Sequence, residues 1–140
     1  MSIPYNVIGC GPIVLPIRPL SEQDPELNMW LQRKPTILIN LGTLYALSSA
    51  DACRIARALR QVLNGDGRSE VQVLWKLQKH PDDQHDVFSD AIGTLETFVK
   101  DGRVKVVSWL KAEPLALLET GSIICSVHHG GANTWFEAIK

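Results

Sequence analysis

The sequence predicts an α/β fold of the Rossmann-like type, in which helices cover both faces of a parallel sheet. Four short, largely apolar runs at residues 36–41, 71–77, 104–110 and 123–127 show no regular alternation of polar side chains. Segments with the apolar spacing of amphipathic helices separate these runs. Strands buried on both faces have this unbroken apolar character, and parallel neighbours need a crossover connection, usually a helix. The two observations therefore predict strands that alternate with helices in one sheet.

The first thirty residues differ from the rest because they hold five of the eight prolines and no sustained apolar period. This composition predicts an extended interdomain or lead-in segment over residues 1–30. The glycines of "GCGP" do not make a dinucleotide fingerprint, since no third glycine follows and Pro12 obstructs a helix start. We expect the packed domain to occupy residues 31–140.

Two amphipathic helices connect the first three strands. The first begins at an N-cap on Ser48 or Ser49 and ends at Asn64–Gly65, where we expect glycine in the left-handed conformation. Its apolar positions follow the i, i+3, i+4 rule: Ala52, Ile55, Ala56, Leu59, Val62 and Leu63. The second follows a polar loop, runs over residues 87–99 and ends at Asp101–Gly102.

A shorter helix precedes the fourth strand, with Pro114 in its first turn, where proline is tolerated. The strand at residues 123–127 then leads into two histidines, two glycines and the start of a last helix. The chain thus ends in a strand, a glycine turn and a helix, an arrangement that recurs in nucleotide-binding folds.

Composition limits the classes of function. The chain has 140 residues, 45% of them hydrophobic, which is enough for one compact core. Its formal net charge is -1, which argues against sequence-independent binding of nucleic acid. No signal-like start and no run long enough to span a bilayer occur in the sequence. We therefore expect a soluble, cytoplasmic protein.

The cysteines and histidines do not predict a disulfide framework or a metal site. Cys10, Cys53 and Cys125 are few and odd in number, and we expect Cys53 and Cys125 to be reduced core residues. His128 and His129 are adjacent on an extended segment, so their side chains point to opposite faces, and no fourth ligand is evident. We expect no metal ion and no cofactor.

Residues at the carboxyl ends of the strands are the candidate site, because ligands bind at this edge of parallel sheets. They are Gly42–Thr43, Trp109 and the turn at residues 128–133. Glycines in that turn allow close approach of a ligand, and the amides at the start of the following helix suit a phosphate. Glu137 suits vicinal hydroxyls, as the acidic residue of dinucleotide folds does. These features predict a nucleotide site, although each alone has a packing explanation.

The stretch "HHGGANTWFEAI" resembles the donor-site signature of UDP-sugar glycosyltransferases of the two-domain GT-B type, especially the fungal members. That signature has a His-x-Gly-x-Asn-Ser/Thr core with a glutamate shortly after it. The segments "WLQRKPTILINLGT", "VQVLWKL" and "VKVVSWL" resemble successive strand regions of the family's C-terminal domain, and "NVIGCGPIVLP" resembles its interdomain segment. The resemblance implies that residues 31–140 are part of a nucleotide-sugar donor-binding domain.

The resemblance also implies roles for the residues at the strand ends. Trp109 stacks on the uracil, and backbone groups of Leu110 pair with the edge of the base. Glu137 accepts hydrogen bonds from the ribose hydroxyls. Gly42 is a further donor-binding residue. The diphosphate is held by the amides of Gly131 and Ala132 and by four side chains, those of Thr43, His129, Asn133 and Thr134. One departure is that Lys111 and Ala112 stand where the family commonly has a Pro-Gln pair.

The function implied is transfer of a hexose from a UDP-sugar to a hydroxyl of a small molecule or lipid, with inversion. The family's N-terminal domain, with its acceptor pocket and histidine base, has no counterpart in these residues. We therefore expect a donor-binding fragment that has no catalytic residue and no activity alone. Its expected partners are a UDP-sugar and an acceptor-binding domain or chain, and self-association through an uncovered sheet edge is also considered.

Two alternatives stay open at this stage. One is the nucleotide-sugar-binding subunit of a split glycosyltransferase, and the other is a non-catalytic α/β nucleotide-binding module.

Overall fold

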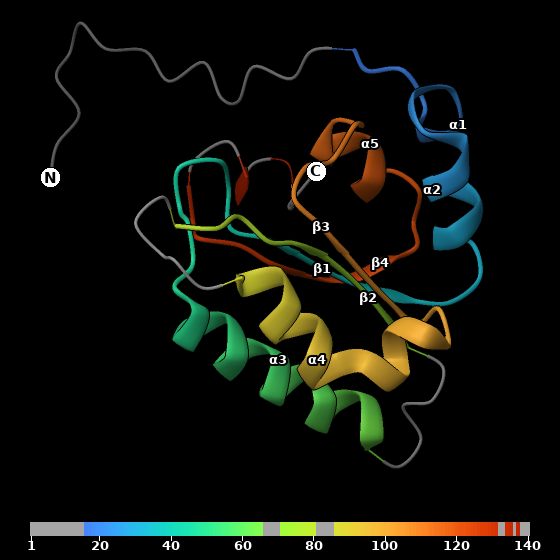
Figure 1. The fold of residues 1–140 in the computed structure, drawn as a ribbon. Helices are drawn as coiled ribbons and strands as arrows, with labels where there is room; N and C mark the ends of the chain where they lie inside the picture. The colour runs from blue at the N-terminus through green and yellow to red at the C-terminus, as the bar shows by residue number, and fades with distance from the viewer. Residues whose placement is uncertain (1–15, 66–70, 81–85, 132–133, 136, 138–140) are drawn as a thin grey trace, which may run out of the picture.

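Four parallel strands form the centre of the molecule. The computed structural model describes residues 16–65, 71–80, 86–131, 134–135 and 137. The strands pair in the order β3-β2-β1-β4, and every pairing in the sheet is parallel (Figure 1). Their bounds are Thr36–Asn40 for β1, Gln72–Lys76 for β2, Val104–Val107 for β3 and Ile123–Val127 for β4. The predicted α/β fold with a parallel sheet is confirmed.

Helices cover both faces of this sheet (Figure 1). The helices are α1 (Leu20–Gln23), α2 (Pro25–Leu31), α3 (Ser49–Asn64), α4 (Val87–Lys100) and α5 (Pro114–Leu118). α3 and α4 lie together on one face, and α1, α2 and α5 lie on the other. Trp75 and Leu74, neighbours on β2, are fully buried in opposite cores, as expected of a strand covered on both faces. Within the described residues, none of these helices has the length and apolar character needed to cross a membrane.

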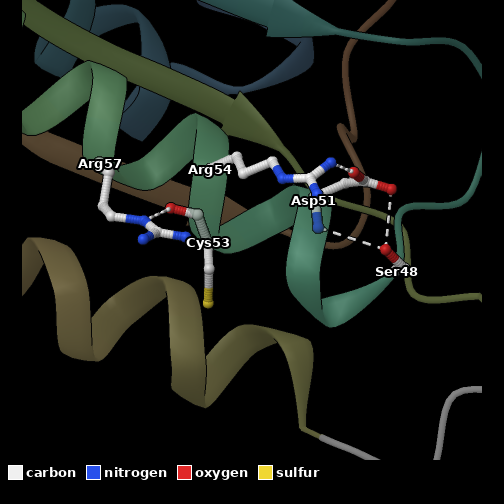
Figure 2. Close-up of polar contacts among 5 residues, drawn as sticks. All are labelled: Ser48, Asp51, Cys53, Arg54 and Arg57. Atoms are coloured by element: carbon white, nitrogen blue, oxygen red, sulfur yellow. Dashed lines mark hydrogen bonds and ion pairs between the residues drawn. The ribbon is translucent and has the colours of Figure 1, made fainter.

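The N-terminus of α3 shows how side chains set the start of a helix. Ser48 Oγ accepts a hydrogen bond from the backbone N–H of Asp51 at 3.2 Å and donates one to its carboxylate at 2.8 Å (Figure 2). Arg54 forms an ion pair with Asp51 at 2.9 Å, so the carboxylate is held from two sides. Of the two predicted N-caps, Ser48 is therefore the one that caps α3.

The segment expected to be extended contains α1 and α2 instead. Pro19 is the N-cap of α1 and Pro25 lies in the first turn of α2, the positions where proline leaves helical hydrogen bonding intact. Leu27 and Trp30 are buried against the sheet, and Trp30 Nε1 donates a hydrogen bond to the Gly102 carbonyl at 2.9 Å. The prediction of an extended chain over residues 1–30 is wrong for residues 20–23 and 25–30, which are helical, and residues 1–15 lie outside the described part.

Three smaller predictions also need correction. Gly65 caps α3 with φ −65° and ψ 143°, because the chain leaves the helix in an extended conformation that does not need the left-handed region. The third strand, predicted over residues 104–110, ends at Val107, whose carbonyl accepts the hydrogen bond from Leu77 N–H next to β2. Cys125 is exposed on β4 rather than in the core, whereas Cys53 is half-buried, and both are free thiols.

β4 is an edge strand with an irregular register. Thr36 pairs with Ile123, but the next residue of β1, Ile37, pairs with Cys125, so Ile124 is the extra residue of a bulge. Ile124 is 59% exposed and Val127 is 42% exposed. This edge therefore presents apolar side chains to solvent, and self-association through it stays a prediction.

Candidate functional site

A cleft of about 700 Å³ opens at the carboxyl edge of the sheet. It is lined by Asn40, Leu41, Gly42, Thr43, Leu44, Tyr45, Lys76, Pro114, His129, Gly131, Thr134 and Glu137. A pocket of about 260 Å³ adjoins it, contains Trp109 and Leu110, and shares Asn40, Thr43, Lys76 and Pro114 with the cleft. The ends of β1 and β2, the segment after β3 and the turn after β4 thus build one continuous hollow, at the edge where parallel sheets bind ligands.

The turn after β1 is held through both backbone polar groups of one residue, Gly42. Gly42 has φ +87°, a conformation that side chains other than glycine rarely adopt. Its N–H donates to the Asn40 side chain at 3.1 Å, and its carbonyl accepts from Lys76 Nζ at 3.2 Å. Asn40 and Lys76 are buried polar residues that end β1 and β2, and together they fix the turn that carries Thr43.

The imidazole of His129 lies between the two glycine turns of the cleft. A Cβ atom built on Gly42 would come within 2.8 Å of His129 Cε1, and one built on Gly131 would come closer still to Nε2. Gly42 and Gly131 therefore leave room for this ring. Gly130, with φ +77°, makes the sharp bend between His129 and Gly131. The structure thus holds His129 at the cleft by packing.

His128 takes a different position. Its Nδ1 accepts a hydrogen bond from the Gly130 N–H at 3.1 Å, and its ring centroid is 6.4 Å from that of Trp135. It is not among the residues that line the cleft. The two histidines therefore separate as the alternation of an extended segment predicts.

Thr134 and Glu137 lie on the first turn of the last helix and complete the wall of the cleft. The Trp135 N–H donates to the Gly131 carbonyl at 2.9 Å, which fixes the start of this turn. Burial raises the pKa of the Glu137 carboxyl, and the nearby charge of Glu113 raises it further. A half-buried carboxylate at this place favours a ligand that can donate hydrogen bonds to it.

Trp109 is a large aromatic side chain in solvent, 63% exposed, just after β3. The Lys76 Nζ atom lies 4.5 Å from the centroid of its ring. The next residue, Leu110, is buried at the wall of the smaller pocket. Because the strand ends at Val107, the indole ring projects from the sheet edge instead of packing into a core.

The structure brings most of the predicted site residues together. Six line the main cleft and two the adjoining pocket, and they are Gly42, Thr43, His129, Gly131, Thr134, Glu137, Trp109 and Leu110. Ala132 and Asn133 lie outside the described residues. Asn40 and Lys76 were missed. The signal that could have identified them is a polar residue at the end of an otherwise apolar strand, which has to reach a partner or a ligand to be buried.

The part of the chain that the structure describes holds no group of three or more His, Cys, Asp or Glu side chains placed to bind a metal ion. The independence of the site from metal stays a prediction.

Comparison with known proteins identifies relatives. No protein-family model matches the chain. The chain is 43% identical over 137 residues to the glycosyltransferase sdnJ of Sordaria araneosa, a match that covers 98% of this chain and 26% of that protein. The chain is therefore a relative of one part of a glycosyltransferase. It spans about a quarter of that relative's length.

Two solved structures share the fold of this chain. A UGT transferase from Siraitia grosvenorii in complex with UDP superposes with a TM-score of 0.64 at 21% identity, over 85% of this chain and 27% of that one. The protein Os79 from O. sativa, also in complex with UDP, gives a TM-score of 0.58 at 21% identity, over 79% of this chain and 22% of that one. The resemblance to glycosyltransferases that the terminal motif predicts is confirmed.

Proposed function

We propose that the cleft holds the nucleotide of a UDP-sugar and that the chain is the donor-binding part of an inverting glycosyltransferase. One observation carries this proposal. An exposed tryptophan, a histidine between two glycine turns and a half-buried carboxylate share one hollow in a chain that is 43% identical to a glycosyltransferase. UDP in the two solved structures with this fold supports the choice of nucleotide.

Trp109 is the proposed platform for the base. Its ring is exposed at the sheet edge, and stacking of a base on an aromatic side chain contributes about 1–3 kcal/mol. Leu110 follows it at the wall of the smaller pocket, where its backbone groups can pair with the edge of the uracil. The smaller pocket is therefore the proposed nucleobase end of the site.

The diphosphate is proposed to lie in the main cleft, against the glycine turns. Thr43 and Thr134 offer hydroxyl donors, His129 offers a ring N–H, and the amide of Gly131 belongs to the turn before the last helix. Backbone amides and charge-assisted donors stabilise the negative charge that develops on the leaving UDP. Ala132 and Asn133 are proposed to add to this set.

Glu137 is proposed to accept hydrogen bonds from the ribose hydroxyls. A carboxylate repels phosphate, but it can accept two hydrogen bonds from a vicinal diol. Its place on the wall of the main cleft allows contact with a ribose located between base and diphosphate.

The residues described above bind and orient a donor, and none is assigned as the catalytic base. In the proposed reaction, a base from another part of the parent protein or from another chain takes the proton of an acceptor hydroxyl. The hydroxyl oxygen then bonds to the anomeric carbon while the bond to UDP breaks. The acceptor is a hydroxyl of a small molecule or lipid.

Calorimetric titration of the full 140-residue chain with UDP in buffer that contains EDTA tests the proposal. We expect saturable one-to-one binding. Binding that appears only after addition of Mg²⁺ would contradict a site without metal, and absence of binding in both buffers would contradict the proposed function.

A further inference from the structure

Two lysines line the cleft and its adjoining pocket, and they differ in position: Lys76 lines both hollows, whereas Lys111 is exposed and lines only the smaller pocket. Lys76 ends β2 and is only 7% exposed, so its ammonium group lies at the floor where the two hollows meet. On one side of that floor is Trp109, and on the other are Gly42 and His129. A ligand that extends from the smaller pocket into the main cleft passes over Lys76.

The contacts of this ammonium group are neutral. It donates to the Gly42 carbonyl at 3.2 Å and lies 4.5 Å from the centroid of the Trp109 ring. Among the described residues, no carboxylate forms an ion pair with it. A buried cation without a counter-charge is unfavourable, and burial accordingly lowers the pKa of Lys76.

An anionic ligand removes this disadvantage. The burial cost is met in the folded chain before a ligand arrives, so an anion is attracted more strongly to this partly desolvated cation than to a lysine in bulk water. The donor proposed for this cleft carries a diphosphate next to its ribose, and the site already orients the ammonium group through the Gly42 carbonyl. Lys76 could also serve only to hold the turn through the Gly42 carbonyl, without binding an anion. Mutation distinguishes an anion-binding role from this structural role.

We propose that Lys76 binds the diphosphate of the nucleotide donor, as a further residue that selects a nucleoside diphosphate over a nucleoside. This inference rests on the proposed function. It assigns to the end of β2 a role that neither the terminal motif nor the strand ends at Thr43 and Trp109 predict. Lys76 is a binding residue in this proposal and takes no part in proton transfer.

Lys76→Gln is the sharpest test, because glutamine keeps an N–H donor for the Gly42 carbonyl and removes the positive charge. UDP and uridine are titrated by calorimetry into the wild-type chain and into the variant. Charge-assisted hydrogen bonds are the strong ones, so we expect the affinity for UDP to fall about tenfold or more. The affinity for uridine, which has no phosphate, should stay unchanged.

Two further variants complete the design. Lys79→Gln removes the same charge from an exposed residue that does not line the cleft, and it should leave both affinities unchanged. Lys76→Met removes the charge with a side chain of similar length, and it replaces Lys76→Gln if circular dichroism shows that the glutamine variant does not fold.

The outcomes separate the inference from the function on which it rests. If the wild-type chain binds UDP and the Lys76 variant binds it equally well, the inference is wrong and the proposed function stands. Equal loss of UDP and uridine would show that Lys76 acts by bracing the turn or Trp109, which also overturns the inference. If the wild-type chain binds neither ligand, the proposed function fails and the inference fails with it.

Discussion

At the scale of single residues, the cleft is shaped by a histidine ring packed between two turns that are distant in the sequence. His129 comes from the segment after β4, and it contacts Gly42 after β1 and Gly131 beyond its own bend. The position of this ring therefore depends on the absence of side chains at both glycines. Substitution at either glycine should displace the His129 ring, which is proposed to contact the diphosphate.

Gly42→Ala should both destabilise the fold and weaken UDP binding. The new methyl group meets His129 Cε1 at 2.8 Å, and the residue has to keep φ +87°. Gly102→Ala is the matched control, because Gly102 has φ +76° and open space around its Cβ position. Strain at a left-handed residue costs about 1–2 kcal/mol, so both variants should lose at least this amount in urea unfolding, and Gly42→Ala should lose more because its methyl group also meets His129. Only Gly42→Ala should also lose affinity for UDP, and equal binding by the two variants would contradict the role of His129.

Trp109→Ala should weaken UDP binding about tenfold and leave the fold intact, because stacking on the ring contributes about 1–3 kcal/mol while 63% of the side chain is exposed. The control is Trp75→Ala, which removes a fully buried ring and should cost about 3–5 kcal/mol of stability. Calorimetry and urea unfolding of both variants measure the two effects. An unchanged UDP affinity, or a loss of stability like that of the Trp75 variant, would place Trp109 among structural residues.

Glu137 should make UDP binding depend on pH. Its pKa is raised in the folded chain, so the carboxyl takes up a proton earlier than an ordinary glutamate as pH falls. If the carboxylate accepts from the ribose, affinity should be full above the raised pKa and decline as pH falls through it. For stability the sign is opposite, because the ionised form is the disfavoured one. Its destabilising effect is absent below the unfolded pKa and complete above the raised folded pKa.

Glu137→Gln shows how much of this pH dependence comes from the Glu137 carboxyl and how much from other groups. The variant should bind UDP more weakly near neutral pH, and the fall in affinity between neutral and acid pH should be smaller than in the wild type. The measurement is a series of calorimetric titrations across this range. A pH profile identical to that of the wild type would show that a group other than Glu137 causes the dependence.

At the scale of elements, the apolar pattern predicts the strands and the two long helices well. The sequence does not reveal α1 and α2, because Pro19 and Pro25 resemble interruptions until Leu27 and Trp30 are seen to pack on the sheet. Asn40 and Lys76 escape prediction for a related reason. A polar residue at the end of a strand becomes part of a site only when sheet order brings β1 and β2 beside each other.

Ser48→Ala should destabilise the chain by about 0.5–2 kcal/mol, the usual cost of losing an N-cap side chain. The hydroxyl accepts from Asp51 N–H and holds the Asp51 carboxylate, so its removal frees the first turn of α3. Ser89→Ala, at an exposed position in the first turn of α4, is the control and should change stability by less than about 0.5 kcal/mol. Equal midpoints of urea unfolding for the two variants would contradict the assigned cap.

At the scale of the whole molecule, strand order explains why residues from four separate segments share one site. The parallel pairing places all four carboxyl ends along one edge, and residues that follow β1 and β4, the strands between which the chain order switches, both line the cleft. Trp109 follows β3 at one border of the sheet, and His129 follows β4 at the other. A nucleotide that contacts both has to lie across the ends of β2 and β1, over Lys76 and Gly42.

The four tryptophans of the chain provide the most direct test of this placement. Trp109 is exposed at the cleft, Trp75 is buried in the core, and Trp30 is buried on the other face of the sheet, where its indole N–H is bonded to the Gly102 carbonyl. A titration with UDP, followed by the indole N–H signals in ¹⁵N–¹H correlation spectra, should shift the Trp109 signal together with the backbone amides of Gly42 and Gly131. The Trp30 and Trp75 signals should not move. Shifts confined to Trp30, or a Trp109 signal unaffected by saturating UDP, would contradict a donor site at this edge of the sheet.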